Sequence, residues 1–130
     1  MNKVYTAVAL ALVVSLPATA EVIKRSDGYT ANCDNATQRE DGTPLAATEI
    51  KNVWYYLDKT WGNLTTPDLS VLMSGGCKST LIDTKSLAVG TYHKYAVTID
   101  TDDQASVVSP QLADPLVIQN AKPKAPGNIR

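Results

Sequence analysis

Apolar and aromatic residues recur in short runs between residues 21 and 118, and turn-forming residues separate these runs. A last run is divided by Pro110, which cannot donate a hydrogen bond within a ladder. About seven short strands separated by turns predict an all-β fold made of two antiparallel sheets packed as a sandwich. The expected strands are residues 21–24, 29–34, 50–57, 69–73, 79–84 and 91–99, and a last strand in two pieces at 105–109 and 115–118.

The strand expected at residues 50–57 has the clearest alternation. Successive side chains of a strand point to opposite faces of its sheet. Val53, Tyr55 and Leu57 therefore share one face, which we expect to join the core. Trp54 and Tyr56 share the other face, which we expect to point outward.

Residues 1–20 have the pattern of a cleaved signal peptide. Lys3 gives a positive start, residues 4–16 are predominantly apolar, and residues 18–20 have the small-x-small form that a signal peptidase accepts. A membrane anchor is the alternative, but the apolar run is shorter than the roughly 20 residues that span a bilayer. We expect cleavage after Ala20, a secreted or periplasmic protein, and no membrane span after cleavage.

The charge balance argues against nucleic acid as a partner. Without Lys3 the chain keeps 11 of its 12 basic residues against 13 acidic ones, a net charge of −2. The basic residues are scattered, whereas a surface that binds phosphate backbones needs clustered Lys and Arg.

Cys33 and Cys77 are the two cysteines. In an oxidising compartment an even number favours a disulfide over free thiols. A metal site would need more ligands than two Cys and the single His at unrelated spacings. We predict a Cys33–Cys77 disulfide, whose loop of about 45 residues would add roughly 3–4 kcal/mol of stability.

The sequence nominates no catalytic residue, cofactor or metal site. His93 is the single histidine, and the sequence alone nominates no acidic or nucleophilic residue to act with it in catalysis. Neither a Gly-x-Ser-x-Gly elbow nor a phosphate-binding Gly-x-x-x-x-Gly-Lys motif occurs. The acidic run at residues 100–103 offers oxygen ligands, but it lacks the Gly and the distal Glu of a helical calcium loop. We expect a protein that is not an enzyme.

Two stretches resemble a known family. Residues 39–45 with 50–56, and residues 87–92 with 96–102, are similar to the B–C, E–F and F–G regions of fibronectin type III domains in bacterial and phage secreted proteins. The resemblance covers residues 29–117 and implies an immunoglobulin-like fold for a domain at residues 21–119. It also implies a spacer or adhesion role, because the family shares no catalytic residues.

The chain departs from that family at three places. Cys33 stands where the family usually has a core Trp, so a bridge to Cys77 on the adjacent strand would replace that ring. His93 occupies the spacing where the family often has a corner Tyr; either a bulge turns Tyr92 inward, or His93 is partly buried. The first strand is also shorter than in the family.

An aromatic patch is the one indication of binding. Trp54 and Tyr56 are expected on the outer face, Trp61 follows in the next loop, and Tyr92 or Lys94 would lie on the neighbouring strand. Clustered exposed rings contact glycans or proteins in many domains. The alternative is that the protein's own loops or Lys stems cover these rings.

The Pro-rich tail at residues 120–130 also has two interpretations. It is a disordered tail, or it adds as a strand to the open edge of the strand at residues 29–34, in its own chain or in a neighbour's. We therefore carry forward two functions. One is a secreted structural or interaction module that can self-associate through the tail, and the other is a carbohydrate- or protein-recognition module that uses the aromatic patch.

Overall fold

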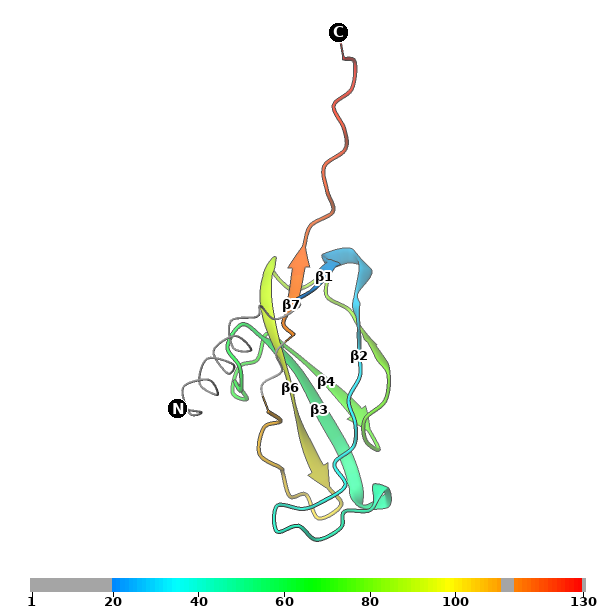
Figure 1. Ribbon diagram of the computed structural model, residues 1–130, viewed down its shortest axis with the longest axis vertical. Helices are drawn as coiled ribbons and strands as arrows, with labels where there is room; N and C mark the ends of the chain where they lie inside the picture. Colours follow the sequence, from blue (N-terminus) through cyan, green and yellow to red (C-terminus); the bar gives the residue numbers. More distant parts are fainter. Residues whose placement is uncertain (1–19, 111–113, 130) are drawn as a thin grey trace, which may run out of the picture.

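The computed structural model describes residues 20–110 and 114–129. In this part the chain is all-β, with seven strands, two short 3-10 helices and no α-helix (Figure 1). Residues 1–19 of the predicted signal peptide lie outside the described residues. The elements are β1 (Glu21–Lys24), η1 (Arg25–Asp27), β2 (Tyr29–Ala31), η2 (Ala47–Glu49), β3 (Ile50–Asp58), β4 (Leu69–Ser74), β5 (Thr80–Ile82), β6 (Gly90–Asp100) and β7 (Leu116–Gln119).

The strands form two sheets, as the sequence predicted. The larger sheet has the order β1-β7-β6-β3-β4, and β2 pairs with β5 in the smaller one. One core cluster combines buried side chains of β2 and β5 with those of β3, β4, β6 and β7. The two sheets are thus the layers of a β-sandwich. We call the side of the large sheet that is turned away from β2 and β5 its outer face.

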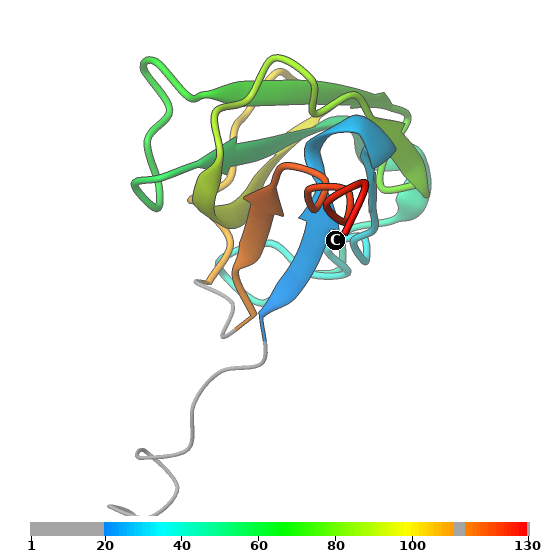
Figure 2. The same ribbon diagram turned by 90° about the horizontal axis from the view of Figure 1, so that it is seen from above.

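The pairing of β1 differs from the purely antiparallel sandwich that was expected. β1 pairs with β7 in parallel, and Figure 2 shows the two strands side by side. The chain then passes through η1 and Gly28 into β2, which belongs to the other sheet. Gly28 has a φ of +74°, and a Cβ there would lie 2.8 Å from the Ile82 carbonyl oxygen, so this crossing requires glycine.

The alternation predicted for β3 is confirmed. Val53, Tyr55 and Leu57 are buried in the core, with at most 4% of each residue exposed. Trp54 and Tyr56 are half-buried and point to the outer face.

At the start of β6 the structure combines parts of both alternatives, since Tyr92 faces the core and His93 is half-buried. Tyr92 is buried in the core, and its hydroxyl donates a 2.6 Å hydrogen bond to the Ala88 carbonyl. No bulge at Tyr92 is needed, because the one irregularity between β3 and β6 lies at Ile50/Asn52, at the other end of the ladder. His93 is half-buried and lies opposite Asp58.

The last strand is in two pieces, although only the second is regular. Residues 105–109 follow the edge of β6: Ser106 N–H donates to the Thr98 carbonyl and Ser109 N–H to the Ala96 carbonyl. The Ser106 and Ser109 hydroxyls accept the N–H groups of Thr98 and Ala96 in return. The two serine hydroxyls thus accept the hydrogen bonds that backbone carbonyls would accept in a regular strand. This pairing ends at Ser109, directly before Pro110.

The Cys33–Cys77 disulfide is present. Cys33 follows β2 and Cys77 precedes β5, so the bridge extends the pairing of these two short strands. Both cysteines pack against the core. The Asn35 side-chain oxygen accepts the Cys77 N–H at 2.7 Å, which holds the segment beside the bridge.

Residues 120–129 form no strand, and Figure 1 shows the tail running past β7 and away from both sheets. The described tail therefore does not add to β2 of its own chain, and pairing with a neighbouring chain stays a prediction. Among the described residues, no helix has the length and apolar composition needed to cross a bilayer.

Candidate functional site

Two of the cross-strand rows on the outer face carry its aromatic side chains. In antiparallel pairs, residues directly opposite each other point to the same face. One row runs from Leu72 on β4 through Trp54 on β3 to Val97 on β6. The next row runs through Ser70, Tyr56 and Tyr95 in the same way.

Three rings of these rows form what we call the aromatic stack: Trp54, Tyr56 and Tyr95. The Tyr56 ring lies 5.2 Å from the Tyr95 ring and 6.5 Å from the Trp54 ring, and both pairs are stacked. Tyr95 is buried at 2% exposure, whereas Trp54 and Tyr56 are half-buried. The stack is therefore anchored at Tyr95 and open to solvent toward Trp54.

The loop between β3 and β4, residues 59–68, covers the buried end of the stack. The Tyr95 hydroxyl donates a hydrogen bond to the Asn63 carbonyl. Burial raises the pKa of Tyr95 to about 12. The loop thus covers Tyr95, a ring that the expected patch did not include, while Trp54 and Tyr56 of that patch stay half-buried.

Asp58 gives this loop its shape from the end of β3. Its buried carboxylate accepts hydrogen bonds from the N–H groups of Thr60 and Asp68 and from the Asn63 side chain. Burial raises the pKa of Asp58, but these hydrogen bonds outweigh burial and hold the net pKa below its ordinary value. An ionised Asp58 therefore holds both ends of the loop that covers Tyr95.

Exposed apolar side chains lie on β4 beside the stack and on the attached loop, where Leu64 is 47% exposed. Leu72 is 46% exposed beside Trp54, and Trp61 is 37% exposed on the loop that Tyr95 holds. The outer-face positions predicted for Trp54 and Tyr56 are thus confirmed, and Trp61 lies in a loop attached to the same face.

Lys94 does not belong to this group, and its expected place on the outer face is wrong. It lies opposite Leu57, a core residue, so its side chain points toward the small sheet. Its ammonium lies 3.3 Å from the Tyr29 hydroxyl and 5.4 Å from the centre of that ring. Tyr92 also faces the core. The alternation along β6 did not show which face joins the core, because both faces of this strand carry large apolar side chains.

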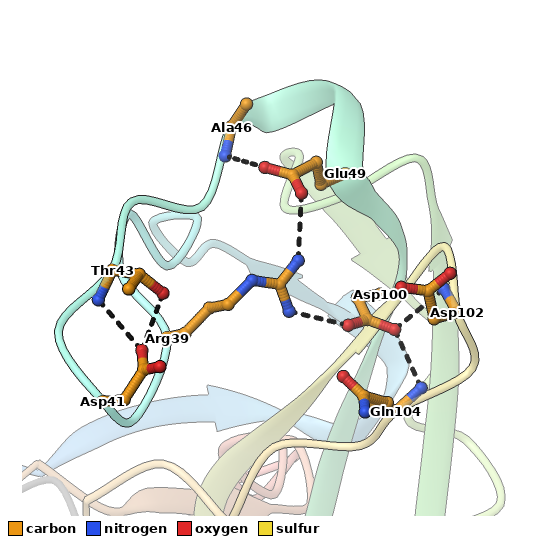
Figure 3. Close-up of polar contacts among 8 residues, drawn as sticks. All are labelled: Arg39, Asp41, Thr43, Ala46, Glu49, Asp100, Asp102 and Gln104. Atoms are coloured by element: carbon orange, nitrogen blue, oxygen red, sulfur yellow. Dashed lines mark hydrogen bonds and ion pairs between the residues drawn. The ribbon is translucent and has the colours of Figure 1, made fainter.

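A second candidate region lies where the segment after β2 meets the end of β6 (Figure 3). The Arg39 guanidinium donates to Asp100 at 2.9 Å and to Glu49 at 3.0 Å. Asp100 also accepts the N–H groups of Asp102 and Gln104. The bond from Arg39, followed by that from the Gln104 N–H, lowers the pKa of Asp100.

An open groove of about 450 Å³ lies beside this cluster, and Gln38, Arg39, Gln104 and Ser106 contribute to its walls. Two carboxylates already neutralise the Arg39 charge, so the main role of this cluster is to hold the surrounding loops together. Sequence reasoning missed the role of Arg39, since Asp100 lies 61 residues away and nothing local signals the pairing.

In the described ranges, 20–110 and 114–129, no group of three or more His, Cys, Asp or Glu side chains is placed to hold a metal ion. The Asp100 carboxylate shapes the turn at residues 100–104 through the bonds described above.

Searches of protein-family models, of curated proteins and of solved structures found no match to this chain.

Proposed function

We propose that this chain is an exported, non-enzymatic interaction module with an immunoglobulin-like β-sandwich fold, whose outer face binds a protein or a glycan at a surface. The Tyr92 hydroxyl bonded to the Ala88 carbonyl, near the start of β6, supports the fold proposal. A tyrosine that returns to the backbone a few residues upstream is a recurring corner of such sandwiches. The fibronectin type III relationship rests on the sequence resemblance, and the strands that carry it, β3 and β6, are neighbours.

Export is supported by two independent features. The N-terminal segment has the pattern of a signal peptide. The Cys33–Cys77 disulfide is of the kind that persists in oxidising compartments.

The aromatic stack is the observation that carries the binding role. The stacking of Tyr56 on Tyr95 fixes the rings before any partner arrives. The loop that the Tyr95 hydroxyl holds at the Asn63 carbonyl fixes them further. A preorganised site loses little side-chain freedom on binding. Trp54 ends the stack on the open side, with exposed Leu72 beside it. These groups offer apolar and ring contact, which suits recognition better than bond-breaking chemistry.

A fluorescence titration tests the proposal. Trp54 and Trp61 are the chain's two tryptophans, one in the stack and one in the attached loop, so their emission reports directly on this face. If a soluble glycan or a surface protein binds this face, we expect the tryptophan emission of the wild type to shift. Trp54→Ala should stay folded but lose binding, which calorimetry measures because this variant lacks one of the two tryptophan reporters. Its melting temperature should fall moderately, because the change removes the stacking on Tyr56.

The matched control is Leu81→Ala, on β5 in the opposite sheet, where the side chain is 71% exposed. It should bind like the wild type. A folded Trp54→Ala variant with unchanged affinity would rule out the outer face as the binding surface.

A further inference from the structure

β4 is an edge strand without the usual protection. In the described residues it ends the large sheet, pairing with β3 on one side only. An open edge presents N–H and C=O groups to which another chain can pair, and proteins commonly protect such edges with Lys, Pro or a bulge. The six residues of β4, Leu-Ser-Val-Leu-Met-Ser, contain neither Lys nor Pro, and their register with β3 is regular.

The other strand edges are less suited to pairing. β1, at the opposite end of the sheet, has four residues and includes Glu21 and Lys24. β2 and β5 have three residues each. β4 is therefore the longest uncharged edge among the described strands.

The register shows which groups of β4 face outward. The Gly75 N–H donates to the Lys51 carbonyl at 2.8 Å, so this pair is hydrogen-bonded. Hydrogen-bonded and non-hydrogen-bonded pairs alternate along an antiparallel ladder. The backbone groups of Ser70, Leu72 and Ser74 therefore point to the open edge, and the side chains of these three residues are also exposed.

The other side of the sheet supports this assignment. The same alternation, carried across β3, requires Ala96 and Thr98 on β6 to point their backbone groups away from β3. They do so, because both bond to residues 105–109.

The edge is complementary to itself. An antiparallel partner related by a two-fold axis at Leu72 sets Leu72 opposite Leu72 of the second copy and Ser70 opposite its Ser74. Every outward backbone group of these three residues then finds a donor or acceptor, and no charge is buried. The row from Val97 through Trp54 to Leu72 continues across the axis into the same row of the second copy.

We propose that two copies of this chain associate through β4, antiparallel and centred on Leu72, into one sheet with a continuous outer face. A pairing of six residues buries little area, so the dimer is of the weak, concentration-dependent kind. The inference does not depend on what the outer face binds.

The C-terminal tail is a poorer occupant of this edge. Backbone N–H groups of a strand point alternately to its two sides. Pro123 and Pro126 are three residues apart, so one of them faces the partner whichever side of the tail pairs.

Sedimentation velocity across a range of protein concentrations tests the dimer. We expect the wild-type full chain to shift from monomer to dimer, and Leu72→Lys to raise the dissociation constant about tenfold or more, because two like charges would face each other. Leu81→Lys, an exposed position on β5, should associate like the wild type. A wild type that stays monomeric overturns the proposal, and so does a folded Leu72→Lys variant that dimerises unchanged.

Cysteine cross-linking tests the register. Directly opposed residues of a hydrogen-bonded pair have Cα atoms about 5.5 Å apart, within disulfide range, so Leu72→Cys should form a covalent dimer under mild oxidation. Ser70→Cys lies on the same edge, but the two copies of residue 70 would be about 14 Å apart, so it should not. Equal cross-linking of both variants, or dimers linked through the tail instead, would overturn the β4 pairing.

Discussion

The Tyr95 hydroxyl donates a hydrogen bond to the backbone carbonyl of Asn63, 32 residues earlier in the chain. This bond joins a buried ring on β6 to the loop that carries Trp61. It thereby connects the interior of the aromatic stack to its exposed surroundings. Asp58 fixes both ends of the same loop, at Thr60 and Asp68, so the loop is held at its middle and at its ends.

Tyr95→Phe should loosen this loop. The change removes one hydrogen bond and leaves the ring, so we expect a loss of about 1 kcal/mol in the free energy of unfolding. Amide hydrogen exchange should rise over residues 59–68. Tyr92→Phe is the matched control, since it loses the bond to Ala88 at a similar energy but should leave exchange in the loop unchanged. Equal loop exchange in both variants would contradict the role of Tyr95.

Alkaline pH should also weaken the fold through Tyr95. An exposed Tyr in the unfolded chain has a pKa of about 10, and burial raises the pKa of Tyr95 to about 12. The folded state therefore favours the neutral phenol. Its contribution to stability is complete below pH 10 and is lost as pH rises from there toward 12.

Urea unfolding at several pH values checks this expectation. The wild type should lose stability above pH 10 more steeply than Tyr95→Phe. Parallel pH profiles for the two proteins would show that Tyr95 does not contribute.

Arg39→Leu should make the protein more sensitive to acid. The Arg39 hydrogen bond is the main cause of the lowered pKa of Asp100, and it also lowers the pKa of Glu49 after the Ala46 N–H. Carboxylates with lowered pKa stabilise the fold above the unfolded pKa of about 4, and this stability is lost as pH falls further.

In Arg39→Leu we therefore expect the acid-unfolding midpoint, followed by circular dichroism, to move to higher pH. Lys51→Met is the control, because it removes the exposed pair with Asp103, whose side chains are 50% and 70% exposed. If both variants unfolded at the same pH, the Arg39 cluster would have no special role.

Loss of the disulfide should destabilise the protein strongly. The bridge closes a loop with a sequence separation of 44, which by the chain-entropy estimate is worth about 4 kcal/mol. Urea unfolding of a Cys33→Ser/Cys77→Ser double variant measures this. A loss under about 1 kcal/mol would indicate that the Asn35 bond and the β2–β5 pairing already hold this segment.

The sequence predicted β3 better than β6 for a physical reason. In β3 the core face carries aliphatic residues and a Tyr, while Trp54 and Tyr56 stay half-exposed, so alternation separates the faces. In β6 both faces are buried, one by the small sheet at Tyr92 and the other by the loop at Tyr95. When both faces of a strand are buried, alternation along the sequence does not show which face joins the core. Lys94 was therefore predicted on the wrong face.

Long-range pairings set the other limit. The parallel pairing of β1 with β7 joins the first and last strands, and the bond from Arg39 to Asp100 spans 61 residues. Neither leaves a local signal. The disulfide was predictable because the number of cysteines and the expected compartment were enough to propose it.

The outer face is the proposed binding surface, and substitution of Trp54 tests it most directly. Once a glycan or protein that shifts the tryptophan emission is in hand, its dissociation constant should be measured for the wild type, Trp54→Ala and Leu81→Ala. We predict that Trp54→Ala stays folded and weakens binding about tenfold or more, while Leu81→Ala binds like the wild type. Equal affinity for all three folded proteins would contradict the account.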